Sequence, residues 1–164
     1  MTLLTPEQQR VEAELRELVG HAAFALTAEG RGVLTAGEAT VVVDVPAHAR
    51  HVVCSTGLGS LPSDPAARQS VVMAALQYNM FLAEGDGAAV AAHPNGDGSL
   101  YLCYRLPLHG LDGTLLANVI ANLAARAGPL AQRLWGLEAT AARAGAAAEV
   151  PAPALSSQFM NLRA

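Results

Sequence analysis

The chain has 164 residues, of which 52% are hydrophobic and 15% are charged, and its formal net charge is −4 at pH 7. This length predicts one domain with a sizeable core, and the low share of charged residues excludes a chain that is disordered throughout. The acidic balance, without a basic stripe, disfavours nucleic acid or an anionic membrane surface as a partner.

The cysteines and the apolar runs indicate the cellular compartment. Cys54 and Cys103 stand apart with no CxxC pair, so we expect no disulfide framework and a reducing cytoplasm. No apolar run reaches the roughly 18–20 residues that span a bilayer. Residues 1–7 hold an early proline and an acid without a basic region, so no signal peptide is expected.

A first helix is predicted to begin at Pro6, with Thr5 as its N-cap and Gln8 in the capping-box position. Gly20 is its expected end. One apolar stripe predicts the buried face of this helix, at Val11, Leu15, Leu18 and Ala22.

Three strands are predicted next, at residues 32–35, 39–45 and 51–56, and the short turns between them favour an antiparallel meander. The Val-rich segment 39–45 is expected to be buried on both faces or nearly so. We interpret Gly57 and Gly59 as a turn that leads from the third strand into the next helix.

A second helix is predicted after its N-cap Asp64 and ends near Glu84. Its apolar arc is broad enough to touch two surfaces and consists of Val71, Val72, Ala75, Leu76, Asn79, Met80 and Ala83. Asn79 is the one polar member of this arc. It either hydrogen-bonds a neighbouring backbone group, marks the register of a helix-to-helix contact, or is simply half exposed.

Residues 88–92 and 99–106 predict two strands joined by a tight turn. Asp112 then caps a Leu-rich last helix, in which Gly128–Pro129 predicts a kink or a break. The resulting order, α-β-β-β-α-β-β-α, predicts an α+β domain over residues 1–140, with one largely antiparallel, twisted sheet and helices packed on it.

Three residues have side chains of the kind that bind metals or act in catalysis: His48, His51 and Cys54. On a strand, His48 and Cys54 share a face while His51 points the other way, so we expect ordinary strand and loop residues. No G-x-S-x-G motif occurs, and no dinucleotide or P-loop fingerprint is complete. No catalytic residue, cofactor or metal is therefore expected, and a small enzyme that uses these three residues is the least favoured alternative.

Several strings, taken in this order, resemble the class I type III secretion chaperones, the Tir-chaperone family. The resemblance covers about residues 5–137 and depends on the short first helix with Leu15 and Leu18, the string from Leu76 to Leu82 with Asn79, the strand at 98–108, and the link Leu111–Asp112 into the last helix.

This resemblance implies a small acidic homodimer in the bacterial cytoplasm that binds the N-terminal, chaperone-binding segment of a secreted effector. The chaperone would keep that segment extended and secretion-competent and target it to the secretion apparatus, without ATP hydrolysis of its own. A secretion-apparatus ATPase is a further partner, whereas nucleic acid and membrane insertion are not expected.

The resemblance also places much of the dimer contact on the second helix, and the candidate dimer residues are Leu76, Asn79, Met80 and Val90. The apolar residues near the first helix and the meander are candidates for effector binding, and some of them must belong to the core. These candidates are Leu15, Leu18, Phe24, Leu26, Val33 and Val41.

Two questions stay open at the level of sequence. A regulatory or scaffolding dimer of the same fold, without a role in secretion, is the main alternative function. Residues 141–164 are rich in Ala and Pro and are expected to form a flexible tail. Because Leu155, Phe159 and Leu162 recur at helical spacing, this tail either covers an apolar groove of the client-free dimer or has no role.

Overall fold

The computed structural model describes residues 4–20, 24–48, 50–81 and 87–145. It confirms the α+β class and the predicted order of elements. In chain order these are α1 (Pro6–Val19), β1 (Arg31–Ala36), β2 (Ala39–Asp44), β3 (His51–Ser60), α2 (Pro65–Phe81), β4 (Ala88–Ala92), β5 (Ser99–Pro107) and α3 (Gly113–Gly145). None of the described helices is long and apolar enough to span a membrane.

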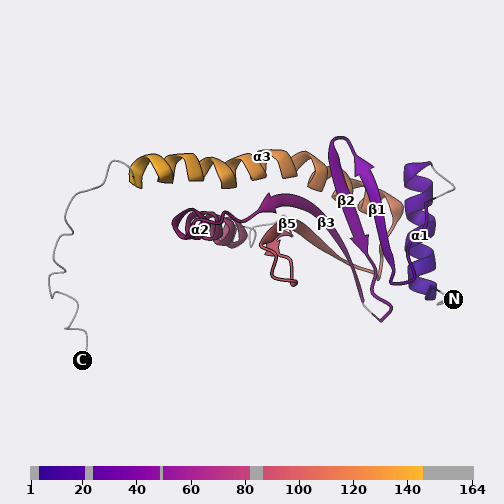
Figure 1. The fold of residues 1–164 in the computed structure, drawn as a ribbon. Coiled ribbons are helices and arrows are strands. Elements are labelled where there is room, and N and C mark those ends of the chain that lie inside the picture. Colours follow the sequence, from indigo (N-terminus) through magenta and orange to yellow (C-terminus); the bar gives the residue numbers. More distant parts are fainter. Residues whose placement is uncertain (1–3, 21–23, 49, 82–86, 146–164) are drawn as a thin grey trace, which may run out of the picture.

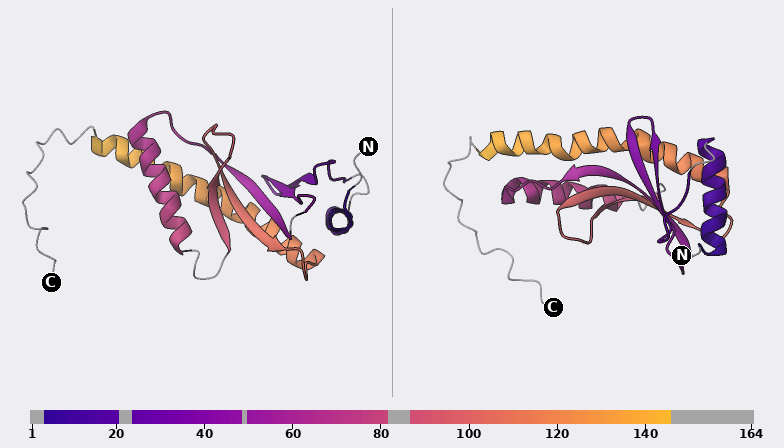
Figure 2. Two further views of the ribbon diagram at one scale, coloured as in Figure 1. Left: turned by 90° about the horizontal axis from the view of Figure 1, so that it is seen from below. Right: turned by 45° about the vertical axis from the view of Figure 1, so that its right-hand side comes forward.

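The five strands form one antiparallel sheet in the order β1-β2-β3-β5-β4, so β1 and β4 are its edges. Figure 1 shows the long helix α3 lying across the sheet, with α1 and α2 at opposite ends of the molecule. The two further views in Figure 2 show the twist of the strands and the later half of α3 beside α2.

The core lies between α3 and one face of the sheet. Alternate residues of β3 and β5 point into it, as a period of two requires. The apolar stripe of α3 covers them, and its buried members are Leu116, Val119, Ile120, Leu123, Ala127, Leu130 and Leu134. From α1, only Val11 and Leu15 enter this core among the apolar residues.

The ends of α1 agree with the sequence prediction. The Thr5 side chain accepts a hydrogen bond from the Gln8 amide, and the Gln8 side chain accepts one from the Thr5 amide, which completes the capping box. Gly20 closes the helix in the left-handed conformation, with φ of 61°. Leu18 was expected in the buried stripe, whereas the structure leaves it exposed.

Two expectations about the meander are wrong. β2 is buried on one face only: Val41 and Val43 are buried, but Val42 is half buried and Thr40 is exposed, because α3 covers a single face of the sheet. β3 also does not end before its glycines. It continues to Ser60 through an irregularity in the register between Gly57 and Gly59, which is typical of a β-bulge.

Gly59 is required by a close approach of α3. Its φ of 134° disfavours other residues, and a Cβ atom at this position would lie 3.1 Å from the ring of Trp135. The indole of α3 therefore packs directly on the backbone of β3. The sequence interpretation of these glycines as a turn overlooked a helix partner that comes from far along the chain.

α3 continues through Pro129 as one helix, so the predicted break does not occur. Proline removes the amide that would bond the Ala125 carbonyl, but that carbonyl is on an exposed residue and accessible to water. A residue before proline normally avoids helical geometry because its Cβ meets the proline ring, and Gly128 has no Cβ. The helix is described as far as Gly145, and the boundary at residue 140 stays a prediction. Residues 146–164 lie outside the described part, so the flexible tail stays a prediction.

Replacing Pro129 with alanine is expected to raise the free energy of unfolding by about 1–3 kcal/mol, because alanine restores a helical hydrogen bond without loss of buried surface. Urea denaturation followed by circular dichroism measures the change. The matched variant Gly128→Ala should instead destabilise the protein, because its new Cβ would meet the ring of Pro129. A Pro129→Ala variant no more stable than the wild type would contradict this account.

Candidate functional site

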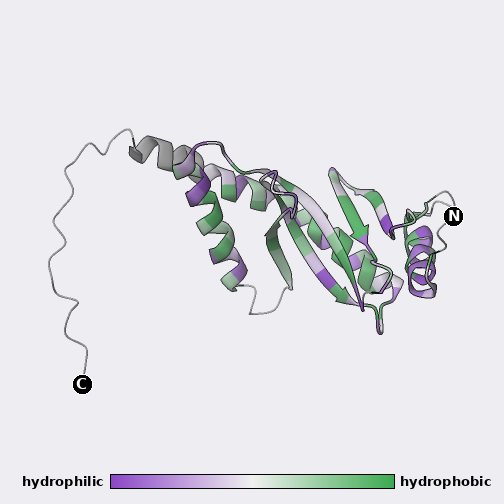
Figure 3. Cartoon of the chain, turned by 60° about the horizontal axis from the view of Figure 1, so that its bottom comes forward, coloured by the Kyte–Doolittle hydropathy of each residue, from purple (hydrophilic) through white to green (hydrophobic). Residues whose placement is uncertain are grey.

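α2 presents an apolar surface that nothing in the described chain covers. Its members are Val72, Met73, Leu76 and Met80, which we call the α2 face. Leu76 is 56% exposed and Met80 is 79% exposed. Val72, Leu76 and Met80 follow one another at intervals of four residues, so they share one side of the helix. The cartoon in Figure 3 shows such hydrophobic positions on α2.

The opposite side of α2 is already used within the chain. Val71 and Ala75 are buried, and α2 packs there against α3 and β4. The broad arc predicted from the sequence therefore does have two surfaces, one inside and one outside. Met73 belongs to the outer surface although the predicted arc omitted it. Its spacing of three and seven residues from Leu76 and Met80 was the signal that could have found it.

Asn79 fastens α2 to the edge strand β4. Its Nδ2 donates to the Val90 carbonyl at 2.9 Å, and its Oδ1 accepts from the Val90 amide at 2.7 Å. The carboxamide thus offers the donor and the acceptor that a neighbouring strand would offer. This confirms the first of the three interpretations of Asn79. Asn79 and Val90, two of the four candidate dimer residues, are engaged with each other, whereas Leu76 and Met80 are exposed.

α1 is held on the domain by side chains that bond to backbone groups. Gln8 is buried and donates from Nε2 to the Val45 carbonyl at 2.7 Å. Glu12, also buried, accepts from the Leu26 amide at 2.7 Å and pairs with Arg16 at 2.6 Å. The Arg16 Nε in turn donates to a carbonyl of the same segment, that of Phe24, at 2.6 Å. These contacts fix the segment 24–26 along α1.

The structure separates the six candidate effector-binding residues into three groups by burial. Leu15, Leu26 and Val41 are buried in the core, which agrees with the expectation that some of the six are core residues. Phe24 is half buried, and its ring lies so close to Gly32 that a Cβ there would come within 2.6 Å of it. Leu18 and Val33 are exposed and remain available to a partner.

Leu18 and Val33 do not lie on one helix or strand. Leu18 is near the end of α1, whereas Val33 lies on the edge strand β1 and is 57% exposed. Val33 is paired with Val42 of β2. Its side chain lies on the face of the sheet opposite to the buried side chain of Leu34. Leu18 lies beside the start of α3, so a client that contacted both residues would have to reach from there to β1.

The geometry does not favour chemistry at His48, His51 and Cys54. His48 lies in the loop after β2, His51 at the start of β3, and Cys54 inside the core. Burial, together with the charge of Asp44, raises the pKa of the Cys54 thiol to about 12, so the thiolate needed for attack is absent near neutral pH. Among the described residues, no three His, Cys, Asp or Glu side chains gather as metal ligands would.

Comparison with known proteins adds a family. A sequence model of the Tir chaperone protein (CesT) family matches residues 13–130. No curated protein sequence matches the chain.

Three solved structures contain chains of similar fold. The ExsC–ExsE complex matches with a TM-score of 0.63 and 17% identity over 82% of this chain and 97% of the other. The Yersinia pestis type III secretion chaperone SycH, in complex with a stable fragment of YscM2, gives 0.56 and 21% over 73% and 96%. The heterodimeric ExoU–SpcU complex from the type III secretion system of Pseudomonas aeruginosa gives 0.51 and 18% over 77% and 96%.

The raised pKa of Cys54 predicts how stability depends on pH. The folded state keeps the thiol protonated up to about pH 12, whereas the unfolded thiol titrates near its ordinary pKa of 9.0. The contribution to stability is therefore full below pH 9 and is lost as the pH rises toward 12, by up to about 1.4 kcal/mol per pH unit. Between pH 9 and 10.5, urea denaturation should show a steeper loss for the wild type than for Cys54→Ala. Parallel curves would contradict the buried, protonated thiol.

Proposed function

The chain belongs to the Tir chaperone protein (CesT) family, and from this premise we propose that it is a cytoplasmic, homodimeric type III secretion chaperone that binds the N-terminal segment of an effector. In this role it keeps the segment extended and secretion-competent and targets it to the secretion apparatus, with the apparatus ATPase as a further partner. It needs no ATP hydrolysis or other catalysis of its own. The observation that carries the proposal is the family match over residues 13–130, which takes in the whole sheet and α2.

The proposed binding of a client is supported by two features of the sheet. β1 is an edge strand, so one side of its backbone is unpaired and can add a strand from a partner. Val33 offers an exposed apolar contact on that strand, and Leu18 offers another on α1, beside the start of α3. Main-chain pairing together with apolar anchors suits an extended segment. The similar folds of SycH and of the ExoU–SpcU complex come from structures in which two different proteins are bound to each other.

The proposed homodimer is supported by the α2 face. A contiguous group of large apolar side chains on one helix is the kind of surface that monomeric proteins seldom expose. A two-fold dimer would pack this face on its own copy, since the same patch serves both protomers. Asn79 and Val90 lie outside the proposed interface. They support it indirectly, because their hydrogen bonds hold α2 at a fixed position on the sheet.

Substituting Leu76 or Met80 with aspartate is expected to convert the dimer to a monomer, because association would bury a charge without a partner. Light scattering coupled to size-exclusion chromatography at micromolar concentration measures the mass. The matched control is Val33→Asp, which places the same charge on an equally exposed residue outside the α2 face and should leave the dimer intact. A monomeric wild type would refute the proposed homodimer.

Val33→Asp and Leu18→Asp are expected to weaken client binding by about tenfold each, because each removes an exposed apolar side chain that the bound client would partly bury. The client is first identified by co-purification from the native cell, and its N-terminal segment is then titrated as a purified peptide. Binding should change little with salt, since apolar contacts are not screened. Binding through another part of the client, or a steep loss of affinity at moderate salt, would contradict this mode.

A further inference from the structure

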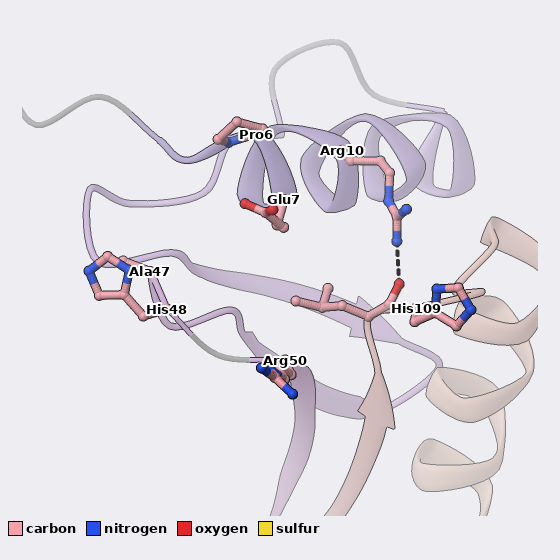
Figure 4. Close-up of a pocket in the computed structure, with 8 residues that line it drawn as sticks. Pro6, Glu7, Arg10, Ala47, His48, Arg50 and His109 are labelled. Carbon is pink, nitrogen blue, oxygen red and sulfur yellow. Dashed lines mark hydrogen bonds between the residues drawn. The ribbon is translucent and has the colours of Figure 1, made fainter.

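A basic hollow lies at the α1 end of the sheet, away from the α2 face. It has a volume of about 700 Å³, and its charged and imidazole side chains are Glu7, Arg10, His48, Arg50 and His109. Figure 4 shows these residues around the hollow, contributed by α1, by the loop after β2 and by the segment after β5. These residues are far apart in the sequence, so no basic motif predicts the hollow.

Backbone hydrogen bonds bring the parts of this hollow together. The Leu108 amide donates to the Arg50 carbonyl at 2.9 Å, which ties the loop after β2 to the segment after β5. The Leu108 carbonyl accepts a hydrogen bond from the guanidinium of Arg10, as the dashed line in Figure 4 shows. Arg10 is thereby directed from α1 toward the hollow, and His109 lies on the next residue after Leu108. These bonds fix the guanidinium of Arg10 and the backbone at Arg50.

The arginines of the hollow carry charge that no carboxylate of the described residues neutralises, unlike Arg16 and Arg31. Arg16 pairs with Glu12, and Arg31 pairs with Asp44. Arg10 and Arg50 form no ion pair with any residue of the described ranges. Glu7 is the only carboxylate in the lining, so the hollow has an excess of positive charge in a protein whose net charge is −4.

The size and chemistry of the hollow select among anions. Its volume exceeds that of a single carboxylate, and its cations are spread over three elements, so it fits several carboxylates in sequence. Arginine forms paired hydrogen bonds with a carboxylate, and imidazole N–H groups add further donors. Among the described residues, no Phe, Tyr or Trp lines it, so it lacks the large stacking platform on which binding of single-stranded nucleic acids depends.

We propose that the basic hollow formed by Arg10, Arg50, His48 and His109 binds an acidic peptide segment of a protein partner. The interaction is electrostatic and separate from the apolar contacts at Leu18 and Val33. It does not depend on the proposed secretion role, because the probe that tests it is a peptide of defined charge.

The test uses fluorescein-labelled hexaglutamate and the full-length protein, with fluorescence anisotropy as the measurement. Hexaglutamate should bind, and its affinity should fall about tenfold between about 25 and about 250 mM NaCl, because salt screens exposed charges. Hexaglutamine of the same length should not bind. Equal binding of the two peptides would overturn the proposal. A hexathymidine oligonucleotide that binds as tightly as hexaglutamate through the same arginines would overturn the choice of a peptide.

Three variants locate the binding. Arg50→Ala should weaken hexaglutamate binding by about threefold, and Arg10→Ala with Arg50→Ala by about tenfold, as expected for exposed ion pairs. Glu7→Gln should strengthen it by about twofold, because it removes the carboxylate that repels the peptide. Neither Arg50 nor Glu7 uses its side chain in a hydrogen bond within the described residues, so Arg50→Ala and Glu7→Gln should fold normally.

A matched control has the same net charge as the Arg10→Ala and Arg50→Ala double variant, but its two substitutions lie far from the hollow. Arg68→Ala combined with Arg133→Ala removes two exposed arginines from α2 and from the later half of α3, at the opposite end of the molecule. This control should bind hexaglutamate as the wild type does. If it weakens binding as much as the Arg10→Ala and Arg50→Ala pair, the effect reflects overall charge and the proposed site is refuted.

Discussion

Burial of one face of α3 against one face of the sheet is the interaction on which the rest of the structure depends. α3 touches four of the five strands and both other helices, and its stripe from Leu116 to Leu134 forms one wall of the core. Because the helical layer covers only one side, the other face of the sheet and the edge strand β1 stay open. The same packing that stabilises the domain therefore leaves it surfaces for partners.

α3 stabilises the centre of the domain by apolar packing, whereas polar side chains attach α1 and α2 at its two ends by hydrogen bonds. α1 buries few apolar residues, and Gln8 and Glu12 compensate by satisfying backbone groups of Val45 and Leu26. At the other end, Asn79 bonds both main-chain groups of Val90. Each of these bonds satisfies a group that would otherwise cost about 1–3 kcal/mol if left buried and unpaired. These hydrogen bonds stabilise the attachment of α1 and α2 and also fix the position of each helix, because a hydrogen bond is directional and an apolar contact is not.

Local patterns in the sequence were sufficient to predict the helices and strands and their order, because helix caps, strand alternation and helical stripes depend on residues that are close in sequence. The capping box at Thr5, the alternation in β5 and the stripe of α3 act within a few residues of one another. Apart from the break predicted at Pro129, which the preceding Gly128 avoids, the errors concern residues whose environment comes from elsewhere in the chain. Gly59 is explained by Trp135, the one-sided burial of β2 by the single helical layer, and the burial of Leu15 rather than Leu18 by how α1 docks. The basic hollow joins three separated segments and had no local signal at all.

The charge distribution gives the two kinds of surface different tasks. Apolar contacts at α2 and near β1 act only at close range and scale with the area they bury. A local excess of positive charge acts over about 8–10 Å at physiological salt, so it can orient an acidic segment before contact. The remainder of the chain is acidic and repels such a segment, which confines it to the hollow at Arg10 and Arg50. An acidic protein with a basic hollow therefore discriminates by repulsion elsewhere as much as by attraction at the site.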